Sequence, residues 1–219
     1  MNSNRKSKKS GKSGAGRAIG RAVRLVRDSL SSQESAIDLL KNQHEEVRTL
    51  FKRIEKASGR AQKTKLFDEL AAKLVGHDAI EREIFYPACE KAMGMTDLLG
   101  EALVEHGIVE FGLYQADQAR QGKDFQFKCT VLSELVEHHV QEEEKEFLPK
   151  AEKALGRDQL EELGAQMQAR FEEALAEGDF RTPLQSNLKQ VMAGAIKPSK
   201  RGASARGGRA SGSKRRKAA

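Results

Sequence analysis

The fold of this chain is decided by the stretch His77-Asp-Ala-Ile-Glu81-Arg-Glu-Ile-Phe-Tyr-Pro87. A second stretch, His139-Val-Gln-Glu-Glu143-Glu-Lys-Glu-Phe-Leu-Pro149, repeats its arrangement. In each, a glutamate follows the histidine by four residues and a proline follows it by ten. Positions four apart lie on one face of a helix, with Cβ atoms roughly 5–6 Å apart. Each stretch therefore points an imidazole and a carboxylate in one direction, as ligands for one metal ion or for a pair of ions.

The composition favours helices in a single domain with appendages. The 219 residues include no Trp, and aromatic residues make up 5% of the chain. No apolar run approaches the roughly 18–20 residues that a membrane span needs. The basic N-terminus has no apolar segment leading to a cleavage site, so we expect no secretory signal and a cytoplasmic protein. The two cysteines, Cys89 and Cys129, do not form a C-x-x-C pair and are expected to be reduced, although a disulfide stays open.

The net charge of +7 hides a strong segregation of charge along the chain. Residues 1–27 contain nine Lys or Arg and no acid, and residues 181–219 contain eleven and no acid. The other 19 of the 39 basic residues stand against all 32 acidic residues in 28–180, which gives that region a net charge of −13. The sequence thus predicts an acidic globular region between two basic tails.

Apolar residues at helical spacing predict four long helices and one covering helix. The first begins at the capping signal Ser35-x-x-Asp38, and Thr96 and Asp124 are expected to cap two others. Pro87 is expected to kink or loosen the last turns of the second. Short loops imply antiparallel neighbours. We therefore expect an all-α, antiparallel four-helix bundle with an additional C-terminal helix and disordered basic tails. Its predicted parts are a tail at 1–30, the bundle at 31–180 and a tail at 181–219.

Part of the N-terminal tail has a helical pattern of its own. Ile19, Val23, Val26 and Leu30 recur at helical spacing with arginines between them. This pattern predicts a short basic amphipathic helix, or a helical tendency that is realised only on a partner, since isolated helices of this length are marginal.

Four histidines, one on each long helix, fall on the apolar face of the predicted bundle. A single inward histidine is usually a core residue with satisfied hydrogen bonds, but four at one depth favour a metal site. Three of them have a glutamate four residues later, and buried carboxylates without a cation are costly. The remaining alternative is a polar bundle core filled with water. The predicted metal ligands are His44, His77, Glu81, His106, Glu110, His139 and Glu143.

The fifth histidine, His138, is not a predicted metal ligand, because its position on the helix differs from that of His77 relative to the proline that follows. His139 precedes Pro149 by the same ten residues that separate His77 from Pro87. His138 then points about 100° away from the site, toward solvent or behind the ligands. Glu144 stays open as an alternative to Glu143.

These residues resemble the hemerythrin-like, HHE cation-binding domain family. The resemblance covers about residues 34–177 and rests on the four histidines in helix order, the two H-x-x-x-E pairs and the endings Phe-Tyr-Pro and Phe-Leu-Pro. The rival ferritin-like pattern, E-x-x-H, does not occur at any of the five histidines.

The resemblance implies two iron ions, bridged by an oxo group and carboxylates, with Glu81 and Glu143 as the bridging residues. The four histidines would be terminal ligands. Oxygen-carrying members typically have a histidine where this chain has Glu110, which puts reversible oxygen carriage in doubt. A carboxylate at that position favours ferric iron, with manganese as a further candidate, whereas zinc would prefer fewer ligands.

The expected function is sensing, scavenging or buffering of iron, oxygen or oxidants, with dioxygen, nitric oxide or peroxide as the small ligand. A di-iron oxidase or peroxidase is the alternative, ranked lower because the sequence shows no separate catalytic constellation.

The basic tails are typical of non-specific nucleic-acid contact, which would place the protein at the nucleoid. Alternatively, the tails serve solubility, fold back on the acidic core or meet an anionic membrane surface.

Overall fold

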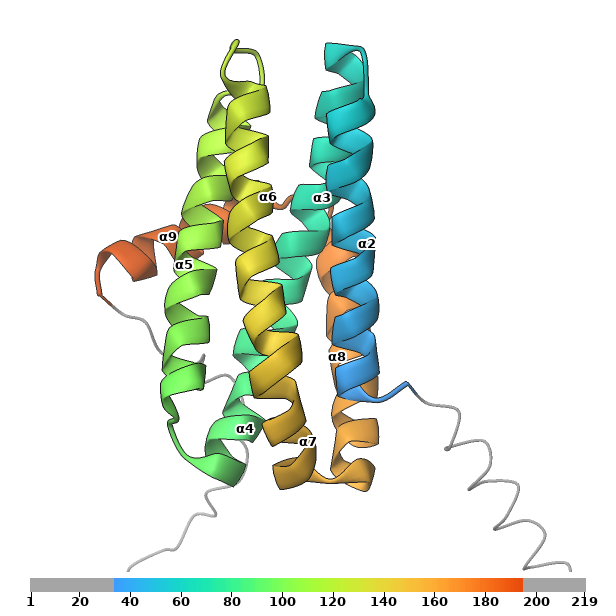
Figure 1. The fold of residues 1–219 in the computed structure, drawn as a ribbon, viewed down its shortest axis with the longest axis vertical. Helices are drawn as coiled ribbons and strands as arrows, with labels where there is room; N and C mark the ends of the chain where they lie inside the picture. The colour runs from blue at the N-terminus through green and yellow to red at the C-terminus, as the bar shows by residue number, and fades with distance from the viewer. Residues whose placement is uncertain (1–33, 195–219) are drawn as a thin grey trace, which may run out of the picture.

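The computed structural model describes residues 34–194, and within that range all regular structure is helical. Four long columns stand side by side (Figure 1). The expected all-α bundle is confirmed. Its elements are α2 (Ala36–Lys56), α3 (Arg60–Ile80), η1 (Glu81–Phe85), α4 (Tyr86–Met93), α5 (Asp97–Gln118), α6 (Phe125–Glu142), η2 (Glu143–Phe147), α7 (Leu148–Leu155), α8 (Arg157–Glu177) and α9 (Arg181–Met192).

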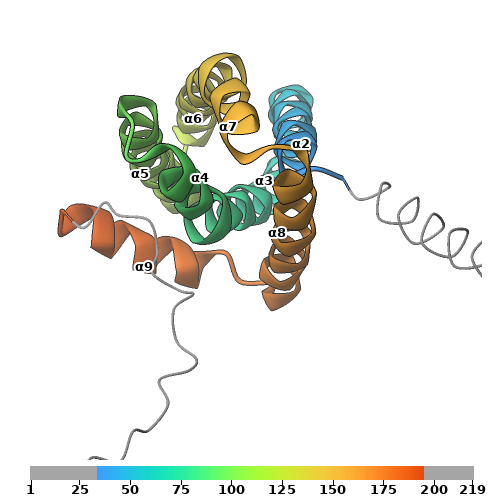
Figure 2. The same ribbon diagram turned by 90° about the horizontal axis from the view of Figure 1, so that it is seen from below.

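The columns are α2, the continuous run α3–η1–α4, α5, and the continuous run α6–η2–α7. The additional helix, α8, packs against α2 and α3 on the outside of this bundle (Figure 2). It buries an apolar stripe that the sequence predicts, made of Leu160, Leu163, Met167 and Phe171. No helix in residues 34–194 combines the length and the apolar character that crossing a membrane requires.

Two of the three predicted helix caps are made by side chains. Ser35 accepts a hydrogen bond from the backbone N–H of Asp38 at 3.2 Å, and Thr96 accepts one from Leu99 at 3.2 Å. Asp124 occupies the N-cap position of α6 but makes no capping hydrogen bond. Its carboxylate pairs instead with Lys128 at 3.4 Å.

A π-helical turn loosens the helix just before Pro87, which is one of the two disturbances expected there. In η1 the backbone N–H of Tyr86 reaches the carbonyl of Glu81, five residues back, and in η2 the N–H of Leu148 reaches Glu143 in the same way. Proline lacks an N–H and crowds the carbonyl four residues before it, and a wider turn accommodates it without ending the helix. The extra residue shifts the helical register, so that the adjacent side chains Phe85 and Tyr86 are both fully buried.

The core consists of two apolar clusters separated by a polar layer. On α2, Leu40 belongs to one cluster and Val47 to the other, with His44 between them. The other three columns also contribute residues to both clusters, and each has its histidine near the boundary between them. Antiparallel packing of four such helices therefore places all four histidines in one layer.

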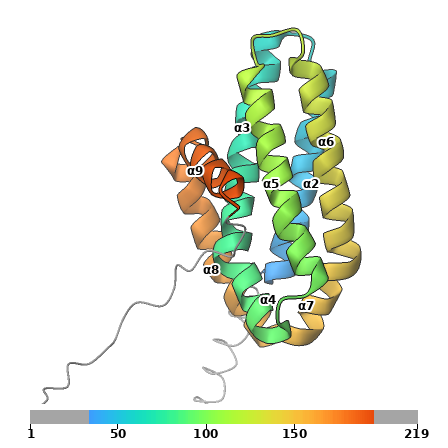
Figure 3. The same ribbon diagram turned by 90° about the vertical axis from the view of Figure 1, so that its left-hand side faces the viewer.

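The predicted tail at 181–219 begins too early, because residues 181–192 form helix α9. Figure 3 shows α9 crossing the outside of the bundle beside α5. Leu184 and Leu188 are buried, and Arg181 pairs with Asp117 at 2.8 Å. The apolar stripe of α9 is short and is interrupted by charged and polar residues, which is why composition alone suggested a tail. The predicted helix at 17–30 and the rest of both tails lie outside the described residues.

Candidate metal centre

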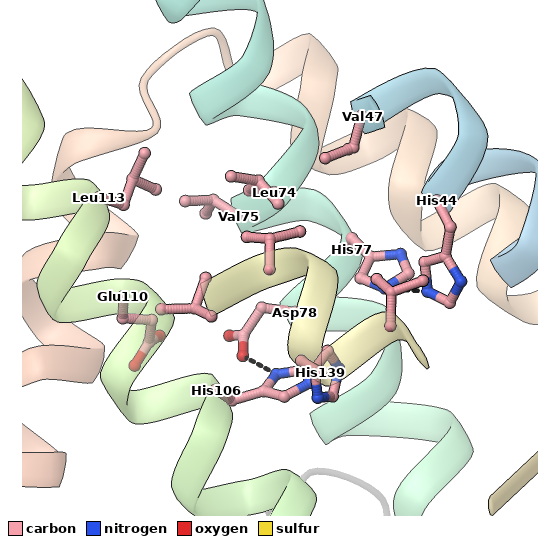
Figure 4. A pocket seen from close by; sticks show the side chains of 13 residues that line it. His44, Val47, Leu74, Val75, His77, Asp78, His106, Glu110, Leu113 and His139 are labelled. Atoms are coloured by element: carbon pink, nitrogen blue, oxygen red, sulfur yellow. Dashed lines mark hydrogen bonds and ion pairs between the residues drawn. The ribbon is translucent and has the colours of Figure 1, made fainter. Parts of the chain in front are cut away.

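The polar layer brings six of the seven predicted ligands together inside the bundle. Figure 4 shows the histidines of this layer, which come from all four columns. Each of these six residues is at most 7% exposed. They are His44 from α2, His77 from α3, Glu81 from η1, His106 from α5, His139 from α6 and Glu143 from η2.

One half of the cluster lies between α2 and α3. His44 Nε2 is 3.2 Å from His77 Nε2 and 3.3 Å from Glu143 Oε2. His77 Nε2 is 3.2 Å from Glu81 Oε2. These four side chains offer donor atoms that all lie within 4.8 Å of one another, close enough to hold one metal ion.

The other half lies between α5 and α6 and shares a carboxylate with the first. His106 Nε2 is 3.1 Å from His139 Nε2 and 3.2 Å from Glu81 Oε2. Glu81 therefore belongs to both groups of potential ligands. Glu143 also lies between the halves, since its Oε2 is 3.3 Å from His44 Nε2 and 3.9 Å from His139 Nε2.

The outer nitrogen of every histidine has an acceptor on a neighbouring helix. These acceptors assign the proton to Nδ1 and leave the Nε2 lone pairs pointing into the cluster, which is the arrangement of metal-binding histidines. The Nδ1 contacts are His77 to Gln43 at 2.7 Å, His106 to Asp78 at 2.6 Å, His139 to Glu105 at 2.9 Å and His44 to Glu144 at 2.9 Å.

The electrostatics of the cluster favour positive charge. Both carboxylate oxygens of Glu81 and Oε2 of Glu143 are buried without a hydrogen-bond partner. Burial and the nearby Glu143 raise the pKa of Glu81 well above its usual value. Burial opposes a charge on His44, yet the adjacent carboxylates of Glu143 and Glu144 raise its pKa to about 9. Protons and metal cations therefore compete for the same side chains, and the donor set fits cations.

Sequence reasoning missed Tyr86, which is fully buried at the edge of the cluster. Its hydroxyl is 2.9 Å from His106 Nε2 and donates to Glu143 Oε1 at 3.3 Å. The residue stands in the Phe-Tyr-Pro ending, whose pattern indicates the end of a helix and not a role for the phenol. The π-helical turn supplies the rotation that points Tyr86 inward, and no residue pattern in the chain indicates that turn directly.

A polar network behind His106 was also missed. Asp78 Oδ1 accepts hydrogen bonds from His106 Nδ1 and from Arg82 Nε, both at 2.6 Å. Its second oxygen accepts one from Asn187 of α9 at 3.1 Å. Helix α9 thereby supports the carboxylate that orients a candidate ligand. Sequence position could have indicated these supporting residues. Gln43, Asp78 and Glu105 are each adjacent in sequence to one of the four histidines.

The structure does not bring Glu110 to the cluster. It lies one turn beyond His106 on α5, where its carboxylate pairs with Arg82 Nη2 at 3.2 Å. Among the described residues it belongs neither to the two buried groups of potential ligands nor to a third, surface group of Glu105, His138 and Glu142. His138 is solvent-facing, at 67% side-chain exposure, and lies 3.4 Å from Glu105, as the register argument expects.

A small cavity of about 40 Å³ adjoins the four histidines. Glu110 and Asp78 line one side of it, and the rest of its wall is mostly apolar, formed by Val47, Leu74, Val75, Val109, Leu113, Val136 and Val140 (Figure 4). A cavity needs at least about 10–15 Å³ of such space to hold one water molecule. This cavity has room for a ligand of two or three atoms.

Glu110 makes a pH-dependent contribution to stability that can be measured. Burial and the neighbouring Asp78 raise its pKa from 4.5 to about 7. The folded state then binds this proton more tightly than the unfolded state, so stability falls as pH rises from about 4.5 to about 7, by about 3 kcal/mol at most. In Glu110→Gln, urea unfolding of the metal-free protein should lose this part of the pH dependence. An unchanged slope between pH 5 and pH 8 would contradict the assignment.

Comparisons with known proteins agree with this geometry. The family described as hemerythrin HHE cation binding domain matches residues 35–151. A crystal structure of a hemerythrin HHE cation binding domain-containing protein from Mycobacterium kansasii superposes with a TM-score of 0.58 at 27% sequence identity, covering 74% of this chain and 94% of that one. No curated protein matches the chain.

Proposed function

Because the chain belongs to the hemerythrin HHE cation-binding family, we propose that it binds two iron ions without haem and senses, scavenges or buffers iron, oxygen or a related oxidant. The observation that carries this proposal is the pair of ligand groups that share Glu81. One group contains His44 and His77, and the other contains His106 and His139. A carboxylate common to two adjacent groups is suited to bridging two cations.

The donor atoms support iron as the metal. Imidazole nitrogens and carboxylate oxygens together suit iron, with manganese as the second candidate. Zinc prefers four ligands in tetrahedral geometry, and six side chains converge here. When bound, iron would supply electron transfer and affinity for small oxidants. The protein's own side chains orient the ligand nitrogens through the Nδ1 hydrogen bonds and exclude bulk water by burial.

Metal analysis of the purified protein, combined with optical absorption, tests the proposal directly. The expected result is two irons per chain, with absorption bands of ferric iron bound to oxygen and nitrogen ligands. A protein that takes up zinc but no iron under the same conditions would contradict it. Turnover of hydrogen peroxide by the iron-loaded protein would favour the peroxidase alternative, for which Tyr86 is a buried phenol close to the ligands.

The cavity supports a small ligand, such as dioxygen, nitric oxide or peroxide, at this site. Replacing Val136 with leucine adds one methylene to a wall of the 40 Å³ cavity. Binding of azide or nitric oxide, followed by optical titration, should weaken about tenfold or more, since overpacking costs about 1–3 kcal/mol. Iron content should stay at the wild-type level. Val131→Leu, on the exposed face of the same helix, is the matched control, and equal affinities in both variants would exclude the cavity as the ligand site.

The charge segregation supports a second role in non-specific nucleic-acid binding. Residues 197–219 contain nine Lys or Arg and no acid, and such contacts weaken steeply as salt rises. In a gel shift, the wild type should retard duplex DNA at 50 mM salt and lose most of this binding at 200 mM. Deleting 197–219 should reduce the retardation without changing the metal content, because the segment contains no ligand. No retardation at low salt would remove this role.

A further inference from the structure

The outward face of the α5–α6 pair is apolar, and nothing in residues 34–194 covers it. Five large apolar side chains on this face are between 45% and 71% exposed: Val104, Ile108 and Phe111 on α5, and Phe127 and Val131 on α6. Residues three or four apart share one face of a helix, so they form one stripe on each helix. Contiguous exposed apolar surface of this kind marks an interaction site.

A groove of about 420 Å³ runs between the two stripes. Its floor includes Gly112, Leu132 and Leu135. A Cβ atom at Gly112 would stand 3.3 Å from Leu132 Cδ1, so the glycine lets α5 and α6 approach closely beneath the groove. An apolar groove between two helices is suited to binding the apolar side of a third helix.

The charges around the groove select its occupant. Helices α5 and α6 contain one base, Lys128, and six acids that are not buried: Asp97, Glu101, Glu105, Glu134, Glu137 and Glu142. Face-to-face pairing of two copies would bring two acidic rims together, which opposes association. The occupant that fits is apolar along one side and basic elsewhere.

One segment of this chain has both properties. Residues 17–30 carry four apolar residues at helical spacing, Ile19, Val23, Val26 and Leu30, together with four arginines and a single acid. The basic C-terminal residues 195–219 have no periodic apolar stripe. The N-terminal segment is therefore complementary to the groove in both apolar pattern and charge.

Chain length decides whether the segment comes from the same copy. Residues 31–33 join Leu30 to Glu34 and span at most about 14 Å. Glu34 lies ten residues before His44, or about 15 Å from the histidine layer along the bundle axis. The near end of the groove, at Ile108, lies about 3 Å beyond that layer on the opposite side. The axial distance of about 18 Å already exceeds the reach of the linker, before the path around the bundle is added.

We propose that residues 17–30 of one copy dock as an amphipathic helix in the α5–α6 groove of a second copy, so that two chains exchange their N-terminal arms. The apolar stripe of the arm then covers Phe111, Phe127 and Val131, and its arginines face the acidic rim. The 219-residue chain then forms a dimer of about twice the 24.2 kDa chain mass.

Cross-linking between two variants of the chain, each with one added cysteine, tests this exchange. Chains carrying Val26→Cys are mixed with chains carrying Val131→Cys and oxidised mildly, and the linked peptides are identified by mass spectrometry. The native Cys89 and Cys129 are buried and do not compete. The expected product is a covalent dimer joining positions 26 and 131 of different chains. Thr130→Cys, exposed on a neighbouring face of α6, should give far less product with the same partner.

Three outcomes would overturn the proposal. A strong cross-link with Val131→Cys chains alone would indicate face-to-face pairing. A chain that carries both Val26→Cys and Val131→Cys could instead form an intrachain disulfide. If it does, and the mixture of single variants gives no covalent dimer, the arm lies on its own bundle. A wild type that has the mass of one chain by light scattering, with no cross-link, would show that the arm does not dock.

Substitutions in the full chain separate docking from folding. Val131→Asp should halve the mass seen by light scattering, whereas Thr130→Asp should leave it unchanged. Both substituted side chains are exposed, so the helical circular dichroism and the metal content of each variant should match the wild type. A Val131→Asp protein that keeps the dimer mass would also contradict the proposal.

Discussion

Replacing Glu81 with alanine is expected to reduce bound iron from two ions per chain to one or none. Glu81 Oε2 lies 3.2 Å from both His77 Nε2 and His106 Nε2, so a single carboxylate serves both halves of the centre. Its removal takes a ligand from each metal position and half of the carboxylate charge of the cluster. The measurement is metal content by mass spectrometry after loading with excess ferrous iron and desalting.

The matched control is Glu83→Ala, two residues further along the same π-helical turn. Glu83 pairs with Arg170 of α8 at 2.9 Å and does not contact the cluster. That variant should keep two irons. Stoichiometric iron in Glu81→Ala would show that Glu81 is not shared between two metal ions, and the two-metal centre would have to be reassigned.

Iron loading is expected to raise the thermal midpoint of the wild type by about 8–16 °C. A ligand at 1,000 times its dissociation constant stabilises the folded state by about 4 kcal/mol, and each kcal/mol shifts the midpoint by about 2–4 °C for a chain of this size. Since binding replaces protons on the ligands, the shift should shrink as pH falls. Differential scanning calorimetry with and without iron measures it.

Glu81→Ala provides the control for this shift as well. Its midpoint should respond weakly to iron, because the shared carboxylate is missing. An equal shift in both proteins would locate the stabilising iron on surface carboxylates, away from the buried histidines.

The sequence was sufficient to predict the bundle and the clustering of six candidate ligands, because both depend on regular helical spacing. His44, His77, His106 and His139 fall at one depth when helices with a constant rise are packed antiparallel. Glu110 has the same spacing, but its carboxylate pairs with Arg82 and lies outside the cluster. Helical spacing does not indicate that ion pair. Contacts between distant segments are set by tertiary packing, which helical periodicity does not encode.

Two other features depended on interactions that local sequence does not show. Tyr86 turns inward because η1 contains five residues in a wider turn, and a proline predicts a disturbance without fixing its form. Helix α9 exists because Leu184 and Leu188 are covered by the bundle and Arg181 meets Asp117. Its composition resembles a tail, and only its environment makes it a helix.

The hydrogen bonds behind the histidines run in one direction around the bundle. Gln43 on α2 holds His77 on α3, and Asp78 on α3 holds His106 on α5. The circle then continues through two further pairs, Glu105 with His139 and Glu144 with His44. Each column thus supplies the hydrogen-bond acceptor for the histidine of the next column, and its own histidine depends on the acceptor of the previous one.

Because these four hydrogen bonds form a closed ring, no column can be positioned independently of the others. Displacing one column removes the support of its successor and withdraws its own histidine in the same movement. The centre should therefore assemble and come apart as one unit, and partially folded chains that bind iron with native affinity should not accumulate. The protein would then hold reactive iron only after the bundle around it has closed.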